Sequence, residues 1–164
     1  MLSNRNIKRV IGLINKFENG LVIFFLFSIL ILAIFQIVLR NLFDSGLIWG
    51  DTLLSILVLW LGLTGSIVAC REQKQINIDV FSQYIPEKYK IYVKNAGLIF
   101  AAFICIVISY YSFIFIKGEF LSGEYAFANI PVWLTESIIP FAFFVMGIRY
   151  FLQSVVFESG NRNK

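Results

Sequence analysis

Polar and apolar residues occupy long separate blocks along this chain. Four apolar blocks stand out, at residues 21–39, 52–69, 96–116 and 130–148. Each approaches the roughly 20 residues that a helix needs to cross the hydrocarbon core of a bilayer. The pattern predicts an all-α integral membrane protein, a single membrane domain over residues 1–164 with four transmembrane helices.

Two of the flanking segments have an amphipathic pattern of their own. In residues 1–18 the apolar side chains recur at helical spacing, with basic and amide side chains on the other side, which predicts a helix lying on the membrane surface. Residues 70–95 repeat the pattern up to Pro86, which with Glu87 suits a helix start. Ordinary solvated loops are the alternative. The apolar positions are Ile7, Val10, Ile11, Ile14 and Phe17, then Ile78, Phe81 and Ile85.

The first apolar block also has to be weighed as a secretory signal, because basic residues precede it. The block is long for a signal, and the sequence VLRNLFDSG after it has no small-x-small cleavage pattern. We therefore expect an uncleaved first helix.

The basic residues are distributed unevenly between the connections. Of the 14 Lys and Arg residues, 12 lie before the first block, between the second and third, or after the fourth, and only Arg40 and Lys117 lie in the other two connections. By the positive-inside rule, this predicts that both termini and the middle connection are cytoplasmic. The localisation that follows is a multi-pass protein of a bacterial inner membrane.

Composition supports the bilayer and narrows the chemistry. The chain is 59% hydrophobic and 15% charged, its mean hydropathy is +0.79, and its net charge of +4 is explained as an orientation signal without a nucleic-acid partner. It contains no His, which excludes imidazole bases and His metal sites. Cys70 and Cys105 are interpreted as small apolar residues. No phosphate-binding or dinucleotide motif is present, so we expect no enzyme, cofactor or metal site.

The second apolar block has two unlike faces when it is placed on a helix. At about 100° per residue, its small residues fall in one arc, which predicts close packing against another helix of the same chain. Trp60, Leu57 and Thr64 point the opposite way and are predicted to contact a partner subunit, the alternative being a Trp that faces lipid. The small residues are Ser55, Gly62, Gly65, Ser66 and Ala69.

Glu136 is the ionisable residue inside the fourth block. Ionisable groups at such positions are costly, so we expect an ion pair with Arg40 or a contact with a partner. A hydrated carboxylate near the surface is the alternative. Pro140 leaves the Glu136 carbonyl without its helix donor and predicts a bend there.

The order of these features resembles the small, DctQ-like membrane subunit of tripartite ATP-independent periplasmic (TRAP) transporters, over nearly the whole chain. Two positions depart from that family's pattern: Thr52 replaces a second acidic residue, and Gln75 replaces a His. The residues that carry the resemblance are Arg40, Trp49, Asp51, Trp60, Gly62, Gly65, Arg71, the run Ile76, Asn77, Ile78 and Asp79, Pro86, the sequence IPVW, Pro140 and Met146.

The resemblance implies a non-catalytic subunit. It would brace a large multi-span transport subunit and help an extracytoplasmic substrate-binding protein to dock, during sodium-coupled uptake of an organic acid such as a C4-dicarboxylate or a sialic acid. Sodium would bind the large subunit. Membrane lipids are further partners. The docking face would be Asp44, Asp51, Glu119 and Glu124, and the basic contacts with the inner leaflet would be Arg71, Lys74, Lys88 and Lys90.

Two other functions fit parts of the pattern. A small proton-coupled exporter would work on its own with Glu136 as its carboxylate, but it would need that carboxylate in the middle of the helix bundle. A cofactor-free structural subunit of another membrane complex fits the composition equally well. The sequence does not name a substrate.

Overall fold

The computed structural model describes residues 2–43, 47, 49–71, 87–127 and 129–161, with side chains described for residues 11–42, 47, 49–71, 92–126 and 129–155. Within these residues, four helices are long and apolar enough to cross a membrane, as predicted. The elements are α1 (Leu2–Phe43), α2 (Gly50–Arg71), α4 (Glu87–Ser122), β1 (Tyr125–Phe127), β2 (Ile130–Pro131), α5 (Val132–Glu136) and α6 (Ile138–Asn161).

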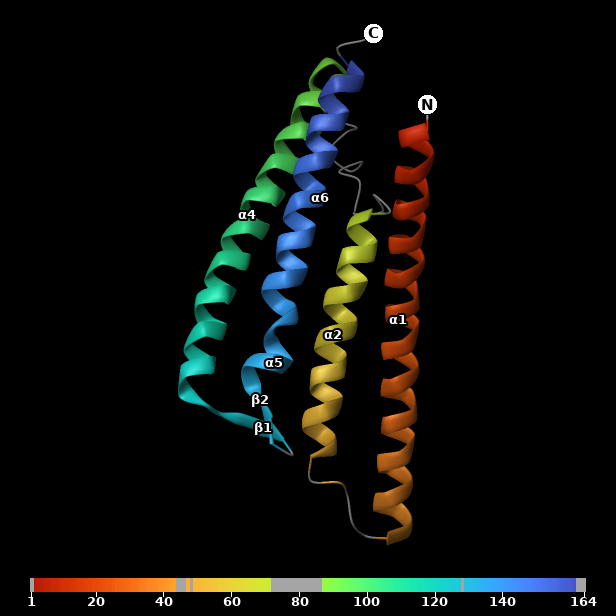
Figure 1. Cartoon of the computed structure of the whole chain (residues 1–164), viewed down its shortest axis with the longest axis vertical. Coiled ribbons are helices and arrows are strands. Elements are labelled where there is room, and N and C mark those ends of the chain that lie inside the picture. The colour runs from red at the N-terminus through yellow and green to blue at the C-terminus, as the bar shows by residue number, and fades with distance from the viewer. Residues whose placement is uncertain (1, 44–46, 48, 72–86, 128, 162–164) are drawn as a thin grey trace.

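The four long helices stand side by side in the order α1, α2, α6, α4 (Figure 1). The extensive contacts are between α4 and α6, between α1 and α2, and between α2 and α6. The start of α1 and the end of α6 lie at one end of the molecule, here called the terminal end. The antiparallel pair β1 and β2 lies at the other end, here called the hairpin end (Figure 1).

Polar residues mark two levels along the helices. Glu18 and Arg40 are about 33 Å apart along α1, and Asp51 and Arg71 are about 30 Å apart along α2, at 1.5 Å per residue. These separations match the roughly 30 Å hydrocarbon core of a bilayer. The apolar segments between the two levels therefore fit one membrane.

The core lies where α2, α4 and α6 meet and is built mostly from small or flexible side chains. Gly147 of α6 is buried there, and a Cβ atom at this position would lie 3.2 Å from Ile106 Cγ1 and 3.6 Å from the Ala102 carbonyl oxygen of α4. Small residues allow such close approach, which is how helices pack in lipid. The buried cluster is Ile67, Cys70, Ala102, Cys105, Ala142, Met146 and Tyr150.

Two boundaries differ from the sequence prediction, and a third agrees with it. The helix α1 runs unbroken from Leu2 to Phe43, so the segment 1–18 and the first predicted span form one helix. The prediction of a separate surface helix over residues 1–18 is therefore wrong. No proline interrupts this stretch. Residues 130 and 131, predicted to begin the fourth span, form β2 instead, and the helix starts after Pro131. The third helix begins at Glu87, directly after Pro86, as the sequence suggested.

Candidate functional site

Trp60 is half-buried and packs against other helices of the same chain. Its indole Nε1–H donates a hydrogen bond of 2.8 Å to the carbonyl oxygen of Thr135, and its ring meets the Phe25 ring edge-on at a centroid distance of 5.7 Å. Thr64, one turn further along α2, is buried. Phe25 of α1 and Thr135 of α5 therefore occupy part of this face, while Trp60 and Leu57 keep some exposed surface, so the contact of Trp60, Leu57 and Thr64 with a partner subunit stays a prediction.

The stripe of small residues on α2 points away from the other helices. A Cβ atom at Gly62 or Gly65 would have no heavy atom within 4 Å. Hydroxyls on this face bond to their own helix: Ser55 donates to the Asp51 carbonyl and Ser66 to the Gly62 carbonyl. The prediction that the stripe packs within the chain is therefore wrong. Its exposed members are Ser55, Gly62, Ser66 and Ala69, and Gly65 is half-buried.

The Trp60 side of α2 faces a helix break between α5 and α6. The helix stops at Glu136 and resumes at Ile138, and Pro140, which has no N–H, follows in the first turn of α6. Backbone carbonyls near such a break need donors, since an unsatisfied group is costly in lipid. Trp60 supplies one to Thr135, and Ser109 donates a 2.9 Å bond to the Pro140 carbonyl. The helix is thus interrupted three residues before Pro140, close to where the sequence predicts a bend.

Glu136 does not form the expected ion pair. Within the described part of the chain, its Oε2 atom is buried and has no hydrogen-bond partner. Arg40 is exposed near the end of α1, and none of the ion pairs between described side chains joins it to Glu136. Glu136 as a whole is half-buried, so the alternative of a carboxylate that stays hydrated near the surface remains a prediction.

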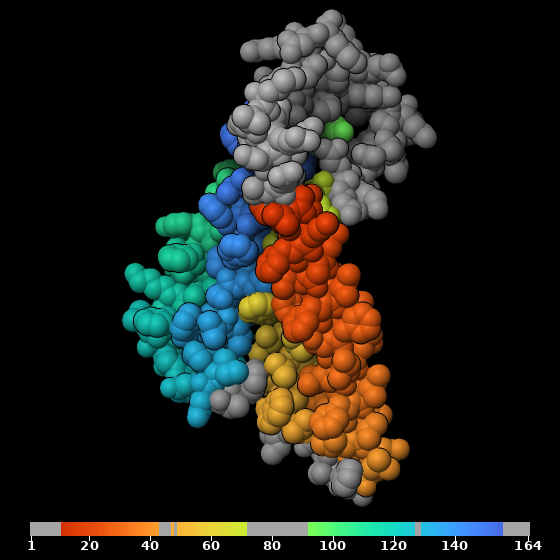
Figure 2. All heavy atoms as spheres, turned by 45° about the vertical axis from the view of Figure 1, so that its right-hand side comes forward, coloured from red at the N-terminus to blue at the C-terminus, as the bar shows by residue number. Residues whose placement is uncertain are grey.

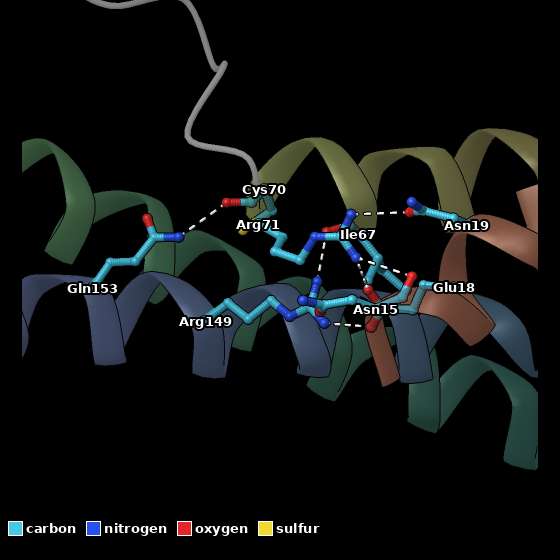
Figure 3. A network of polar contacts seen from close by, with 8 residues as sticks. All are labelled: Asn15, Glu18, Asn19, Ile67, Cys70, Arg71, Arg149 and Gln153. Carbon is cyan, nitrogen blue, oxygen red and sulfur yellow. Dashed lines mark hydrogen bonds and ion pairs between the residues drawn. The ribbon is translucent and has the colours of Figure 1, made fainter. Parts of the chain in front are cut away.

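The main polar cluster lies at the terminal end, around Glu18. One Glu18 oxygen accepts from Arg71 of α2 at 3.3 Å, and the other accepts from Arg149 of α6 (Figure 3). Arg149 also donates to the Ile67 carbonyl at 2.7 Å. This Glu18 cluster ties α1, α2 and α6 together, and the three charged side chains are only 15% to 20% exposed.

Further hydrogen bonds extend the tie across the same end. Arg71 donates to the Asn15 carbonyl and to Asn19 Oδ1 of α1, and Gln153 of α6 donates to the Cys70 carbonyl (Figure 3). Ser154 donates to Asn95 Oδ1, which links α6 to α4. Sequence reasoning missed this cluster. Its one visible signal was Glu18, an acidic residue in a segment otherwise basic.

The four basic residues that were predicted to contact the inner leaflet lie in different surroundings. Arg71, half-buried in the Glu18 cluster, contacts protein rather than pointing freely to lipid. Lys88 and Lys90 fall in the first turn of α4. Lys74 lies outside the described residues.

The predicted docking residues gather at the hairpin end. Asp51 and Glu124 are exposed there and Glu119 is half-buried, while Asp44 lies outside the described residues. Asp51 accepts a 3.2 Å hydrogen bond from Gln36 Nε2 of α1. Gly50 makes room for this contact, because a Cβ atom there would lie 2.1 Å from that nitrogen.

Comparison with known proteins identifies the family. Residues 29–157 match the model of the tripartite ATP-independent periplasmic transporters, DctQ component. The chain belongs to the DctQ family. A DctQ component is a part of a transporter and not an enzyme, and the four apolar helices make this one a multi-pass protein of the inner membrane.

A longer protein carries a region similar to this DctQ chain. The sialic acid TRAP transporter permease protein SiaT of Haemophilus influenzae (strain 86-028NP) is 34% identical to it over 93 residues, which are 57% of this chain and 15% of that protein. The chain therefore matches only a small part of its relative's length.

Proposed function

We propose that this DctQ component braces the large transport subunit of a TRAP transporter and helps an extracytoplasmic substrate-binding protein to dock. The transporter would take up an organic acid coupled to sodium, with sodium bound by the large subunit. The similarity to a sialic acid permease protein supports an acid of this kind. Neither a sodium site nor a substrate site is assigned to the described residues.

The arrangement of the helices is the observation that supports the bracing role. The helices follow one another in a row, and much of their apolar surface faces outward, including aromatic side chains of α1 and α4 such as Phe24, Phe27, Phe103 and Phe113. In the space-filling view, α1 (red to orange) forms one edge of the molecule and partly covers α2 (yellow) (Figure 2). A row of this kind offers broad apolar faces to a second membrane protein.

Polar ties at both ends would keep this row rigid. The Glu18 cluster fixes α1 to α2 and α6 at the terminal end, and the bond from Gln36 to Asp51 fixes α1 to α2 at the hairpin end. A brace has to resist bending while its partner moves. Two ties about 30 Å apart along α2 serve that purpose.

The charge distribution supports one orientation. Twelve of the 14 basic residues lie on the terminal side of the spans, so this side would face the cytoplasm. The hairpin end, with Asp51, Glu119 and Glu124, would then face the binding protein. Complementary charge would speed its docking and make that docking sensitive to salt.

Co-purification tests the bracing role. The chain carries a tag and is co-expressed with the large transport subunit proposed as its partner, and the stoichiometry in mild detergent is measured. A one-to-one complex is expected, whereas a chain that purifies alone or as a homodimer contradicts the proposal. For docking, Glu124→Gln is expected to slow association of the binding protein with the complex in nanodiscs, and Lys16→Gln at the opposite end is the matched control.

A further inference from the structure

Arg149 has more hydrogen-bond donors than the protein uses. A guanidinium carries five N–H groups. Within the described part of the chain, Arg149 donates from Nη1 to the Ile67 carbonyl and from Nη2 to Glu18 (Figure 3). The side chain is 19% exposed, so its remaining N–H groups lie within reach of a ligand. These N–H groups are not among the buried polar atoms that lack a partner, so an acceptor from outside the protein can reach them.

Positive charge around Arg149 favours an anionic acceptor. The described charged side chains at this level are Glu18, Arg71 and Lys16, and the single carboxylate already serves both arginines. A second anion would therefore meet a local excess of positive charge. Planar guanidinium groups bind phosphate oxygens particularly well, through paired hydrogen bonds.

The depth and the neighbours of Arg149 indicate the source of that anion. Arg149 pairs with Glu18, which marks one limit of the 30 Å apolar slab, where phospholipid headgroups begin. Ile148 and Leu152 lie to one side of Arg149 on α6 and are 44% and 55% exposed, so an acyl chain could lie against them. We propose that Arg149 binds the phosphate group of an anionic phospholipid at the terminal end of the molecule.

Lipid retention tests this site on the full chain. The purified chain is placed in nanodiscs of equal parts phosphatidylglycerol and phosphatidylcholine, released, and its retained lipids are identified by native mass spectrometry. Wild type is expected to retain phosphatidylglycerol about tenfold over phosphatidylcholine, the ratio that one charge-assisted contact supports. Arg149→Gln is expected to abolish the preference, and Arg40→Gln at the opposite level, the matched control, is expected to keep it.

A second variant covers the case in which Arg149→Gln does not fold. Glu18→Gln leaves Arg149 in place and increases the local excess of positive charge, so retention of phosphatidylglycerol is expected to rise. Equal retention of the two lipids by wild type, or unchanged preference in Arg149→Gln, would overturn the proposal.

Two further arms identify the source of the anion. Inorganic phosphate that displaces phosphatidylglycerol from wild type would support the phosphate chemistry but assign the site to a free anion. The measurement is then repeated on the chain co-purified with its large partner. Preference for phosphatidylglycerol in the chain alone but not in the complex would show that an acidic group of the partner occupies Arg149, and would contradict the lipid assignment.

Discussion

Replacing Glu18 by Gln is expected to loosen the terminal end of the row of helices. The carboxylate serves two arginines from two other helices, and its side chain is 15% exposed. Removing one partner of a buried ion pair costs about 3–5 kcal/mol, because the other charge stays buried without compensation. Partial exposure of the cluster and the acceptor oxygen that Gln retains reduce this figure, so we expect a loss of about 2–3 kcal/mol in the free energy of unfolding.

Equilibrium unfolding by sodium dodecyl sulfate in mixed micelles measures this loss, with the fluorescence of the tryptophans as signal. Glu124→Gln, which removes an exposed carboxylate at the hairpin end, is the control and is expected to stay within about 0.5 kcal/mol of wild type. In the double variant Glu18→Gln with Arg149→Gln, the two losses are expected to fall short of additivity by about 1 kcal/mol, as for residues in one network. A Glu18→Gln protein as stable as the control, or strictly additive losses, would refute the reasoning.

The remaining predictions concern which helix surfaces pack inside the protein. Gly147→Ala is expected to lower the free energy of unfolding by about 1–3 kcal/mol, because the added methyl group overpacks against Ile106. Gly62→Ala places its methyl group in open space and is expected to be neutral or stabilising by up to about 1 kcal/mol. Equal effects of the two variants in the same unfolding assay would contradict the assigned faces. Trp60→Phe keeps an aromatic ring, although a smaller one, but removes the donor to the Thr135 carbonyl, so a loss of about 1–3 kcal/mol is expected from the same assay. Unchanged stability would show that the bond contributes nothing.

The number and type of the spanning helices could be predicted from the sequence because they depend on local hydrophobicity over roughly 20 residues. The helix start at Glu87 and the break near Pro140 were also predictable, since proline acts on its own neighbours. Each of these signals is contained within a short stretch of chain.

The rotation of α2 could not be predicted in the same way. Small residues permit close packing in lipid but do not require it, and in the structure the Trp60 side packs against α1 and α5 instead. The Trp60 indole bonds to the Thr135 carbonyl, 75 positions along the chain. Similarly, Glu18 meets Arg149 across 131 positions. Neither pairing has a local sequence signal.

Uptake by reconstituted proteoliposomes tests the central claim most directly. The large subunit and the binding protein are reconstituted with or without this chain, and sodium-driven entry of a labelled organic acid is measured. We predict that uptake requires this chain and falls in the Glu18→Gln variant, whose brace is loosened. Full uptake by the large subunit and the binding protein without this chain would contradict the account.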